Sequence, residues 1–298
     1  MNKLKQARLM MIISMVAFGT IAVFVRAVKV TSGELALYRA VLAAVLLGGY
    51  LLLTGQKISF RSIGKSLPLL MFSGMAMGFN WILLFEAYKH TTVSVATLSY
   101  YFAPVIVTAV SPFLFREKLT GRQILCFAMS TLGLVLITGT GDLSQGSSHL
   151  TGVLYGLGAA VLYATVILLN KFIKGVEGIH RTFLQFLAAI VVLLPYVAST
   201  TGFSLAGLDA SGWVCLLIVG FVHTGVTYCL YFSALRDLPG QKAAILSYID
   251  PLVAVLISAL LLGEPMTAMH MIGGLLILGF TLWNELGGAW PVMKKKRE

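Results

Sequence analysis

Ten stretches of about 20 mainly apolar residues follow one another along the chain, with short connectors between them. A stretch of this length crosses the hydrocarbon core of a bilayer as a helix, because a helix satisfies its own backbone hydrogen bonds where lipid offers no partner. We therefore predict an all-α integral membrane protein. Its ten transmembrane helices are expected near residues 8–28, 32–54, 66–88, 93–115, 121–139, 149–173, 178–200, 211–235, 241–262 and 267–287.

The charged residues are few, and they lie at the ends of the apolar stretches. Only 11% of the 298 residues are charged, against about 25% in a soluble domain. The net charge of +11 does not indicate a nucleic-acid partner, because the basic residues form no single patch and fit contact with membrane lipid headgroups. The chain has no HExxH motif, P-loop, nucleophile elbow or Cys/His metal spacing, so we expect no enzyme, cofactor or metal site.

The positions of Lys and Arg predict the orientation of the chain in a cell membrane. With ten spans, both termini lie on one side, and 18 of the 22 Lys and Arg residues fall on that side. The other side has only Arg26, Lys29 and Lys89, and Arg39 lies inside the second span. Because Lys and Arg near span ends remain on the cytoplasmic side, both termini are predicted to be cytoplasmic.

One pattern occurs twice in the chain. Residues 88–117 and 235–264 align without a gap at an offset of 147, which pairs Pro104 with Pro251 and Glu117 with Glu264. The first and sixth spans align at an offset of 145, which pairs Arg26 with Lys171. We predict two related halves, 1–145 and 146–298. Since each half has five spans, an odd number, the second half is inverted relative to the first, as in transporters that work by alternating access.

The paired motifs resemble the drug/metabolite transporter superfamily, and within it the EamA-domain family. They run from Ala103-Pro104-Val105 to Glu117-Lys118-Leu119 in the first half, and from Asp250-Pro251-Leu252 to Gly263-Glu264-Pro265 in the second. The resemblance covers nearly the whole chain. It implies a secondary carrier of small metabolites, commonly amino acids and their relatives, usually an exporter in a bacterial cytoplasmic membrane.

Asp250 is a carboxylate inside the ninth apolar stretch, about 13 Å from the start of that stretch at 1.5 Å per residue. Ionisable groups inside the membrane are costly and are candidates for function. Asp250 is expected to bind a proton or a substrate cation. The alternative is a structural role, in which Asp250 pairs with a basic or hydroxyl group and compensates the backbone disrupted by Pro251. Its counterpart in the first half, Ala103, is apolar, so the repeat does not require the acid.

Arg39 is the other charge well inside a span. It could bind a substrate carboxylate, or it could pair with Glu34 or Glu86 as part of an external gate. Both interpretations remain open from the sequence.

A set of polar and aromatic side chains is predicted to line a central substrate site, because amphipathic rings suit organic solutes. Core packing and interfacial belts also use such rings, and an amide can serve helix packing instead. The predicted substrate-binding residues, with Asp250, are Asn80, Trp81, Tyr101, Tyr163, Tyr228 and Tyr248.

Together these features predict a carrier of a small polar or amphoteric metabolite that works by alternating access, with proton coupling as a hypothesis, and the resemblance implies that it is an exporter. Asp250, Arg39 and Glu86 are the predicted coupling or gating residues. A multidrug or organic-cation exporter of the same fold is the main alternative, and a non-transport membrane enzyme or sensor is a further one.

Overall fold

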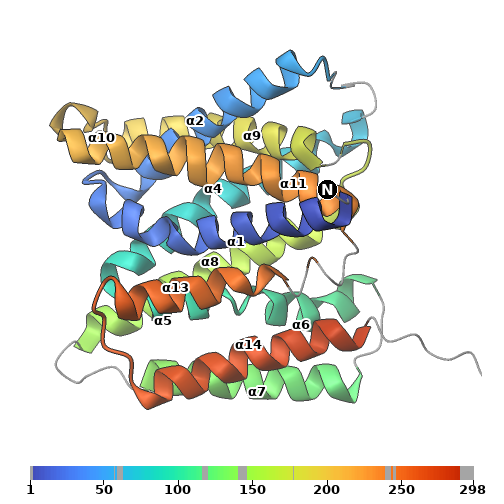
Figure 1. Cartoon of the computed structure of the whole chain (residues 1–298), viewed down its shortest axis with the longest axis vertical. Coiled ribbons are helices and arrows are strands. Elements are labelled where there is room, and N and C mark those ends of the chain that lie inside the picture. The colour runs from blue at the N-terminus through green and yellow to red at the C-terminus, as the bar shows by residue number, and fades with distance from the viewer. Residues whose placement is uncertain are drawn as a thin grey trace, which may run out of the picture.

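The structure of the chain, a computed structural model, describes residues 3–56, 58, 63–115, 120–139, 146–176, 178–238, 243 and 246–288. All regular elements in these residues are helical (Figure 1). The elements of the first half are α1 (Lys3–Ala27), α2 (Ser32–Leu53), η1 (Gly64–Ser66), α4 (Leu67–His90), α5 (Val93–Tyr100), α6 (Ala103–Phe115) and α7 (Gly121–Gly139). The elements of the second half are α8 (Gly146–Phe172), α9 (Gly178–Thr200), η2 (Leu205–Gly207), α10 (Ala210–Leu217), η3 (Ile218–Val226), α11 (Thr227–Asp237), α13 (Ile249–Leu260) and α14 (Ala268–Gly288).

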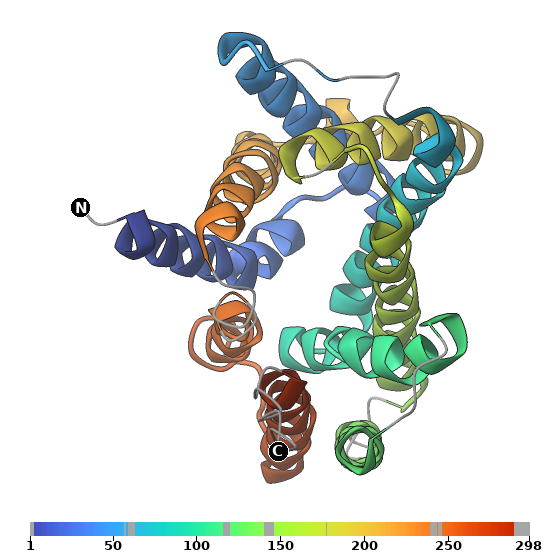
Figure 2. The ribbon, with the colours of Figure 1, turned by 90° about the vertical axis from the view of Figure 1, so that its right-hand side faces the viewer.

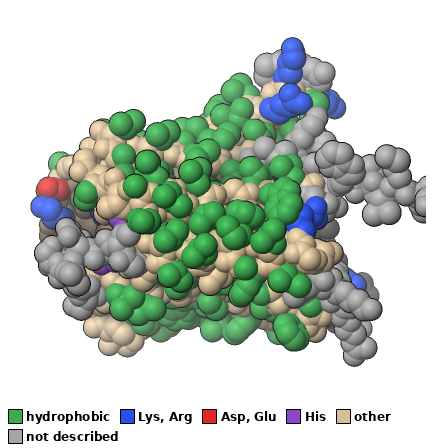
Figure 3. Space-filling view, turned by 90° about the horizontal axis from the view of Figure 1, so that it is seen from below, with side chains coloured by type: hydrophobic (Ala, Val, Ile, Leu, Met, Phe, Trp, Pro, Cys, Tyr) green, Lys and Arg blue, Asp and Glu red, His purple; other side chains and the backbone are tan. Residues whose placement is uncertain are grey.

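The lengths of the helices and their surfaces confirm a ten-span membrane protein. Eight helical stretches of the described residues are long and apolar enough to cross a membrane. Two shorter apolar stretches complete the ten: Ile249–Leu260, which is α13, and Ala268–Asn284, which lies within α14. Large apolar side chains are exposed at positions such as Leu53 (91%) and Phe113 (85%). On the face drawn in Figure 3, hydrophobic side chains cover the middle, and Lys and Arg lie toward the two ends. A belt of this kind matches the hydrocarbon core of a bilayer.

The two halves run in opposite directions through the bundle. Arg26, in the last turn of α1, donates hydrogen bonds to the carbonyls of Tyr88 and Thr91. Ser148, in the first turn of α8, donates to the neighbouring carbonyl of His90 at 3.1 Å. The end of α1 therefore lies beside the start of α8, so the first helices of the two halves are antiparallel. We call this end of the bundle the distal end, and the end at which the chain begins and α14 finishes the termini end (Figures 1 and 2).

The fourth and ninth spans are both interrupted at matched positions. The fourth consists of α5 and α6, which are separated by a turn at Tyr101 and Phe102. In the ninth span, α13 begins at Ile249, directly after a turn at Tyr248. Discontinuous helices of this kind build the central sites of inverted-repeat transporters, because the interruption directs backbone and neighbouring side chains inward.

These interruptions correct the expectation that Asp250 lies deep within one continuous helix. It lies in the first turn of α13, and Pro251 follows it there. Pro104 likewise lies in the first turn of α6. A helix tolerates proline in its first turn, because the N–H that proline lacks has no intrahelical acceptor at that position. Glu117, which closes the predicted fourth span, lies outside the described residues.

Several helices approach closely through glycine. A Cβ added to Gly74 of α4 would lie 2.5 Å from the Cβ of Ala188 and 2.5 Å from the carbonyl oxygen of Gln185, both on α9. The backbones of α4 and α9 are thus in contact at Gly74, as expected where small residues face each other in membrane helices.

Gly74→Ala is therefore expected to destabilise the protein by about 1 to 3 kcal/mol, the usual cost of overpacking a filled interior. Gly49 is the matched control, since a Cβ there meets nothing within 4 Å, and Gly49→Ala should leave stability unchanged or raise it by up to about 1 kcal/mol. Thermal unfolding in detergent measures both. An unfolding temperature of Gly74→Ala at or above that of the wild type would contradict the close contact.

Candidate functional site

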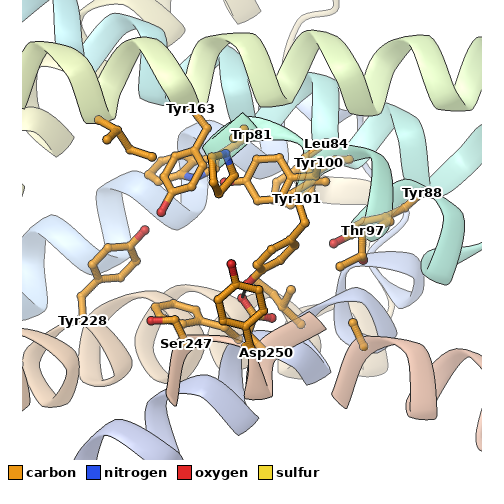
Figure 4. Close-up of a pocket in the computed structure, with 18 of the residues that line it drawn as sticks. Trp81, Leu84, Tyr88, Thr97, Tyr100, Tyr101, Tyr163, Tyr228, Ser247 and Asp250 are labelled. Carbon is orange, nitrogen blue, oxygen red and sulfur yellow. Dashed lines mark hydrogen bonds between the residues drawn. The ribbon is translucent and has the colours of Figure 1, made fainter. Parts of the chain in front are cut away.

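A cavity of about 550 Å³ lies between the two halves (Figure 4). Side chains from α1, α2, α4, α5, α6, α8, α11 and α13 line it. Its volume lies within the range of small-molecule sites, about 300 to 1,000 Å³. Among the described residues, the lining includes the polar side chains Arg39, Thr97, Ser247 and Asp250, and the aromatic side chains Phe18, Trp81, Phe85, Tyr88, Tyr100, Tyr101, Tyr163, Tyr228 and Tyr248.

A hydrogen bond joins the two interrupted spans across the cavity. The hydroxyl of Tyr101 donates to Oδ2 of Asp250 at 2.6 Å. Tyr101 lies in the turn between α5 and α6, and Asp250 lies in the first turn of α13. Figure 4 shows the rings of Tyr101, Tyr163 and Tyr228 pointing into the cavity from different parts of the chain. The carboxylate of Asp250 thus has a hydroxyl donor and lies in an enclosure of aromatic rings.

Among the described residues, Arg39 is the cation that lines the same cavity, and several contacts hold its side chain. Its side chain is buried, Nε donates to Oγ1 of Thr224 at 3.1 Å, and the guanidinium carbon lies 4.3 Å from the ring centre of Trp81. The same guanidinium carbon lies 5.4 Å from the ring centre of Phe85. Stacking on aromatic rings fixes the plane of a guanidinium group. Among the described residues, neither Nη1 nor Nη2 has a hydrogen-bond acceptor, and Arg39 is one of the residues that line the cavity.

The residue that holds Arg39 belongs to a π-helical segment, η3, which the sequence pattern does not reveal. The hydroxyl of Thr224 donates to the carbonyl of Val219, five residues earlier, at 2.8 Å, and therefore accepts from Arg39. Thr227 makes the same five-residue bond to Val222. Such π-helical turns occur often at functional sites. Here the wider turn places Thr224 against α2.

The acids that were candidate partners of Arg39 are bonded elsewhere in this conformation. Glu34 accepts from the backbone N–H and the hydroxyl of Ser204, at 2.5 and 2.6 Å. Glu86 pairs with Lys89 at 3.0 Å and does not line the cavity. Neither Glu34 nor Glu86 is therefore bonded to Arg39 in this structure.

The structure brings most of the predicted site residues together. Trp81, Tyr101, Tyr163, Tyr228, Tyr248 and Asp250 all line the cavity with Arg39. Asn80 does not: its buried amide donates to the carbonyl of Ala159 on α8 at 2.6 Å. This bond serves the packing of α4 against α8, which is the alternative use of a buried amide in a membrane helix.

Four residues of the cavity lining that carry a hydroxyl group are absent from the sequence-based prediction: Tyr88, Thr97, Tyr100 and Ser247. Tyr100 and Tyr101 are adjacent at the end of α5, and both line the cavity, with their ring centres 6.0 Å apart. The adjacent tyrosines beside Pro104 were the available signal.

Comparison with known proteins places this architecture in a family. The EamA-like transporter family matches residues 6–139 and again residues 150–284. The uncharacterized transporter YxxF of Bacillus subtilis (strain 168) is 32% identical over 262 residues, which cover 85% of this chain and 81% of that protein. A probable amino-acid metabolite efflux pump of Salmonella typhimurium (strain LT2) is 27% identical over 236 residues, which cover 74% and 77% of the two chains.

A solved crystal structure shares the fold, with a TM-score of 0.64 at 16% identity and coverage of 92% of this chain and 96% of the other. The family match occurs once in each half and spans most of the sequence. The ten helices and the inverted halves agree with it. This chain therefore belongs to the EamA-like transporter family, a family of multi-pass membrane transporters and not of enzymes.

Proposed function

We propose that this transporter is a secondary carrier that exports an amino acid or a related amphoteric metabolite by alternating access. One observation carries the proposal: the cavity between the halves holds a guanidinium whose terminal nitrogens have no acceptor among the described residues, together with a carboxylate. A zwitterion complements both charges. Its carboxylate would accept two parallel hydrogen bonds from Arg39, and its ammonium group would bind Asp250.

The aromatic lining supports the same substrate class. Tyrosine and tryptophan rings attract an ammonium group through their faces and provide apolar area for a side chain. A purely cationic drug fits less well, because it would bring a second positive charge into the cavity beside Arg39. The charge of Arg39 thus favours an amphoteric solute over the organic-cation alternative.

Two observations support the proposed orientation of the protein in the membrane and the proposed direction of transport. The distribution of Lys and Arg in the sequence favours a cytoplasmic termini end, and we place the protein in the cytoplasmic membrane with that orientation. The relative from Salmonella typhimurium is named as an efflux pump for amino-acid metabolites, which supports export.

Proton coupling is part of the proposal, and it depends on Asp250. Among the described residues, Asp250 is the carboxylate that lines the cavity. A carboxylate that binds either a proton or the ammonium group of the substrate, but not both, couples the two movements in opposite directions. Alternate binding of this kind makes an exchanger from one acidic group.

Ligands that share a side chain and differ in charge test the substrate class. We expect leucine and other zwitterions to raise the unfolding temperature of the purified protein, since a ligand at about 100 times its Kd stabilises by about 2.7 kcal/mol. The matched amine lacks the carboxylate, and the matched acid lacks the ammonium group, so both should stabilise it less. Flux into liposomes then checks each ligand that binds.

Two outcomes of this screen would contradict the proposal. Stabilisation and flux by amines, with indifference to amino acids, would favour the organic-cation exporter. Binding without any flux would favour a sensor.

A further inference from the structure

Helix α1 meets the backbone of α13 at Asp250, and α1 has no side chain at the point of contact. A Cβ added to Gly19 of α1 would lie 2.7 Å from the carbonyl oxygen of Asp250 and 2.7 Å from the Cβ of Val253. Carbon atoms in ordinary contact are about 3.5 to 4.0 Å apart, so a side chain at this position requires a shift of about 1 Å. The first turn of α13 therefore packs directly on the backbone of α1, where Gly19 is buried.

Two contacts hold the first turn of α13. One is the contact with Gly19, and the other is the hydrogen bond that the hydroxyl of Tyr101 donates to Oδ2 of Asp250 at 2.6 Å. The helix begins directly after a turn at Tyr248, so its first turn does not continue a preceding helix without interruption. The place of Asp250 thus depends on how closely α13 approaches α1.

Other contacts fix α1 in the bundle. The hydroxyl of Thr20 and Nε2 of His223, in η3, form a hydrogen bond of 3.1 Å. Arg26, in the last turn of α1, donates to the carbonyl of Tyr88 near the end of α4 at 2.9 Å. Because α1 is bonded on both sides of Gly19, a side chain at that position would displace the first turn of α13.

The other half of the chain shows that the shared fold does not require glycine at this position. At the offset of 145, Gly19 corresponds to Ala164 of α8, and at the offset of 147, Asp250 corresponds to Ala103 of α6. Ala164 and Ala103 belong to one buried cluster, where α8 packs against α6. The half without the acid thus accommodates a Cβ, and the half with the acid has glycine.

We propose that Gly19 positions Asp250 for its part in transport, because the missing side chain lets α13 approach α1 so closely that the carboxylate reaches Tyr101. Gly19 is not among the residues that line the cavity, so it acts through α13. A displaced first turn weakens the ammonium half of the proposed site and leaves the carboxylate half, at Arg39, unchanged. This inference rests on the proposed role of Asp250 and adds the residue on which that role depends.

Three ligands that share one side chain test this role. Leucine has both charged groups, isoamylamine lacks the carboxylate, and isocaproate lacks the ammonium group. We expect Gly19→Ala to weaken the binding of leucine and isoamylamine by about tenfold or more, since misplacing a functional group by about 1 Å can cost a factor of about 100. Isocaproate, whose partner is Arg39, should bind Gly19→Ala as it binds the wild type. Titration calorimetry measures all three.

Gly133→Ala is the matched control, because it overpacks a helix contact of similar geometry elsewhere. A Cβ at Gly133 of α7 would lie 2.6 Å from the carbonyl oxygen of Gly273 and 3.0 Å from the Cβ of Leu276, both on α14. Among the residues that the structure describes, none of α7 or α14 lines the cavity. Gly133→Ala should therefore lower the unfolding temperature and leave the affinities for the three ligands unchanged.

Val253→Ala provides a milder change at the same contact. It trims the contact from the side of α13 and adds no atom, so it serves the test if Gly19→Ala does not fold. We expect Val253→Ala to weaken the binding of leucine and isoamylamine by a smaller factor, and to leave that of isocaproate unchanged.

Infrared spectroscopy detects the displacement of Asp250 without any substrate. The carboxyl band of protonated Asp250 is the band that Asp250→Asn removes from the difference spectrum between acidic and alkaline pH. Tyr101→Phe should move this band to higher frequency, because a carbonyl that loses a hydrogen bond has a stiffer C=O bond. Gly19→Ala should move the band in the same direction, and Gly133→Ala should leave it in place.

A band that stays at the wild-type frequency in both Gly19→Ala and Val253→Ala would overturn the positioning role of Gly19. Equal losses of affinity for all three ligands in Gly19→Ala would overturn it as well. Wild-type protein that binds none of the three ligands would instead contradict the proposed function, and the infrared band would still decide whether Gly19 positions Asp250.

Discussion

Arg39→Ala is expected to weaken the binding of zwitterionic substrates by about 30-fold to about 4,000-fold. This range corresponds to about 2 to 5 kcal/mol, the usual cost of removing one partner of a buried charge pair. The reason is local: Arg39 is buried, and its terminal nitrogens have no acceptor among the described residues, so the substrate carboxylate would be their partner. Binding constants from titration calorimetry measure the effect.

Selectivity distinguishes this loss from general damage to the cavity. Arg39→Ala should leave the binding of matched amines unchanged or stronger, because a positive charge has been removed. Arg39→Lys keeps the charge but loses the planar pair of donors and the stacking on Trp81, so its affinity for zwitterions should be intermediate. Equal losses for amino acids and amines would reject the role of Arg39 as a carboxylate ligand.

Asp250→Asn is expected to abolish uptake driven by a pH gradient in liposomes, down to the level of vesicles without protein. Asparagine keeps the size of aspartate, and its carbonyl can still accept from the hydroxyl of Tyr101, which bonds Asp250 at 2.6 Å. It cannot take up a proton. Exchange of labelled for unlabelled substrate should therefore continue, at higher substrate concentrations, because the ammonium group has lost its ion pair.

Tyr101→Phe is the control for Asp250→Asn. It removes the hydrogen bond and retains the carboxyl group, so uptake should still respond to the pH gradient. If Asp250→Asn retained full dependence on the gradient, proton coupling through this residue would be wrong, and the ammonium site would have to be tested separately by binding.

The membrane class, the ten spans and the duplication follow from the chain without any structure. Each depends on local or regularly repeated properties: the length of apolar stretches, the charges at their ends, and a constant offset between two motifs. The candidate charges Arg39 and Asp250 were identified for a similar reason. Placing an ionisable group inside an apolar stretch costs free energy, so such a group is a candidate for function.

Asn80 and Glu86 show that the sequence does not identify the bonding partner of a polar residue. Both are polar residues of α4 and were predicted for the site or its gate, yet one bonds the backbone of α8 and the other pairs with Lys89. A polar group in an apolar stretch must find a partner, but the sequence does not specify whether that partner is a solute, a backbone carbonyl or a neighbouring side chain.

The apolar pattern and the repeat thus define a membrane carrier of two inverted halves, because hydrophobicity and spacing are properties of the chain alone. The direction in which each side chain points, by contrast, is not determined by hydrophobicity and spacing. The π-helical segment provides Thr224 as the acceptor for Nε of Arg39, and the packing of the helices places Tyr100 and Ser247 in the lining of the cavity. These features arise when helices distant in sequence pack against one another, and contacts such as those of Tyr101 with Asp250 and Arg26 with Glu264 exist only in the assembled bundle.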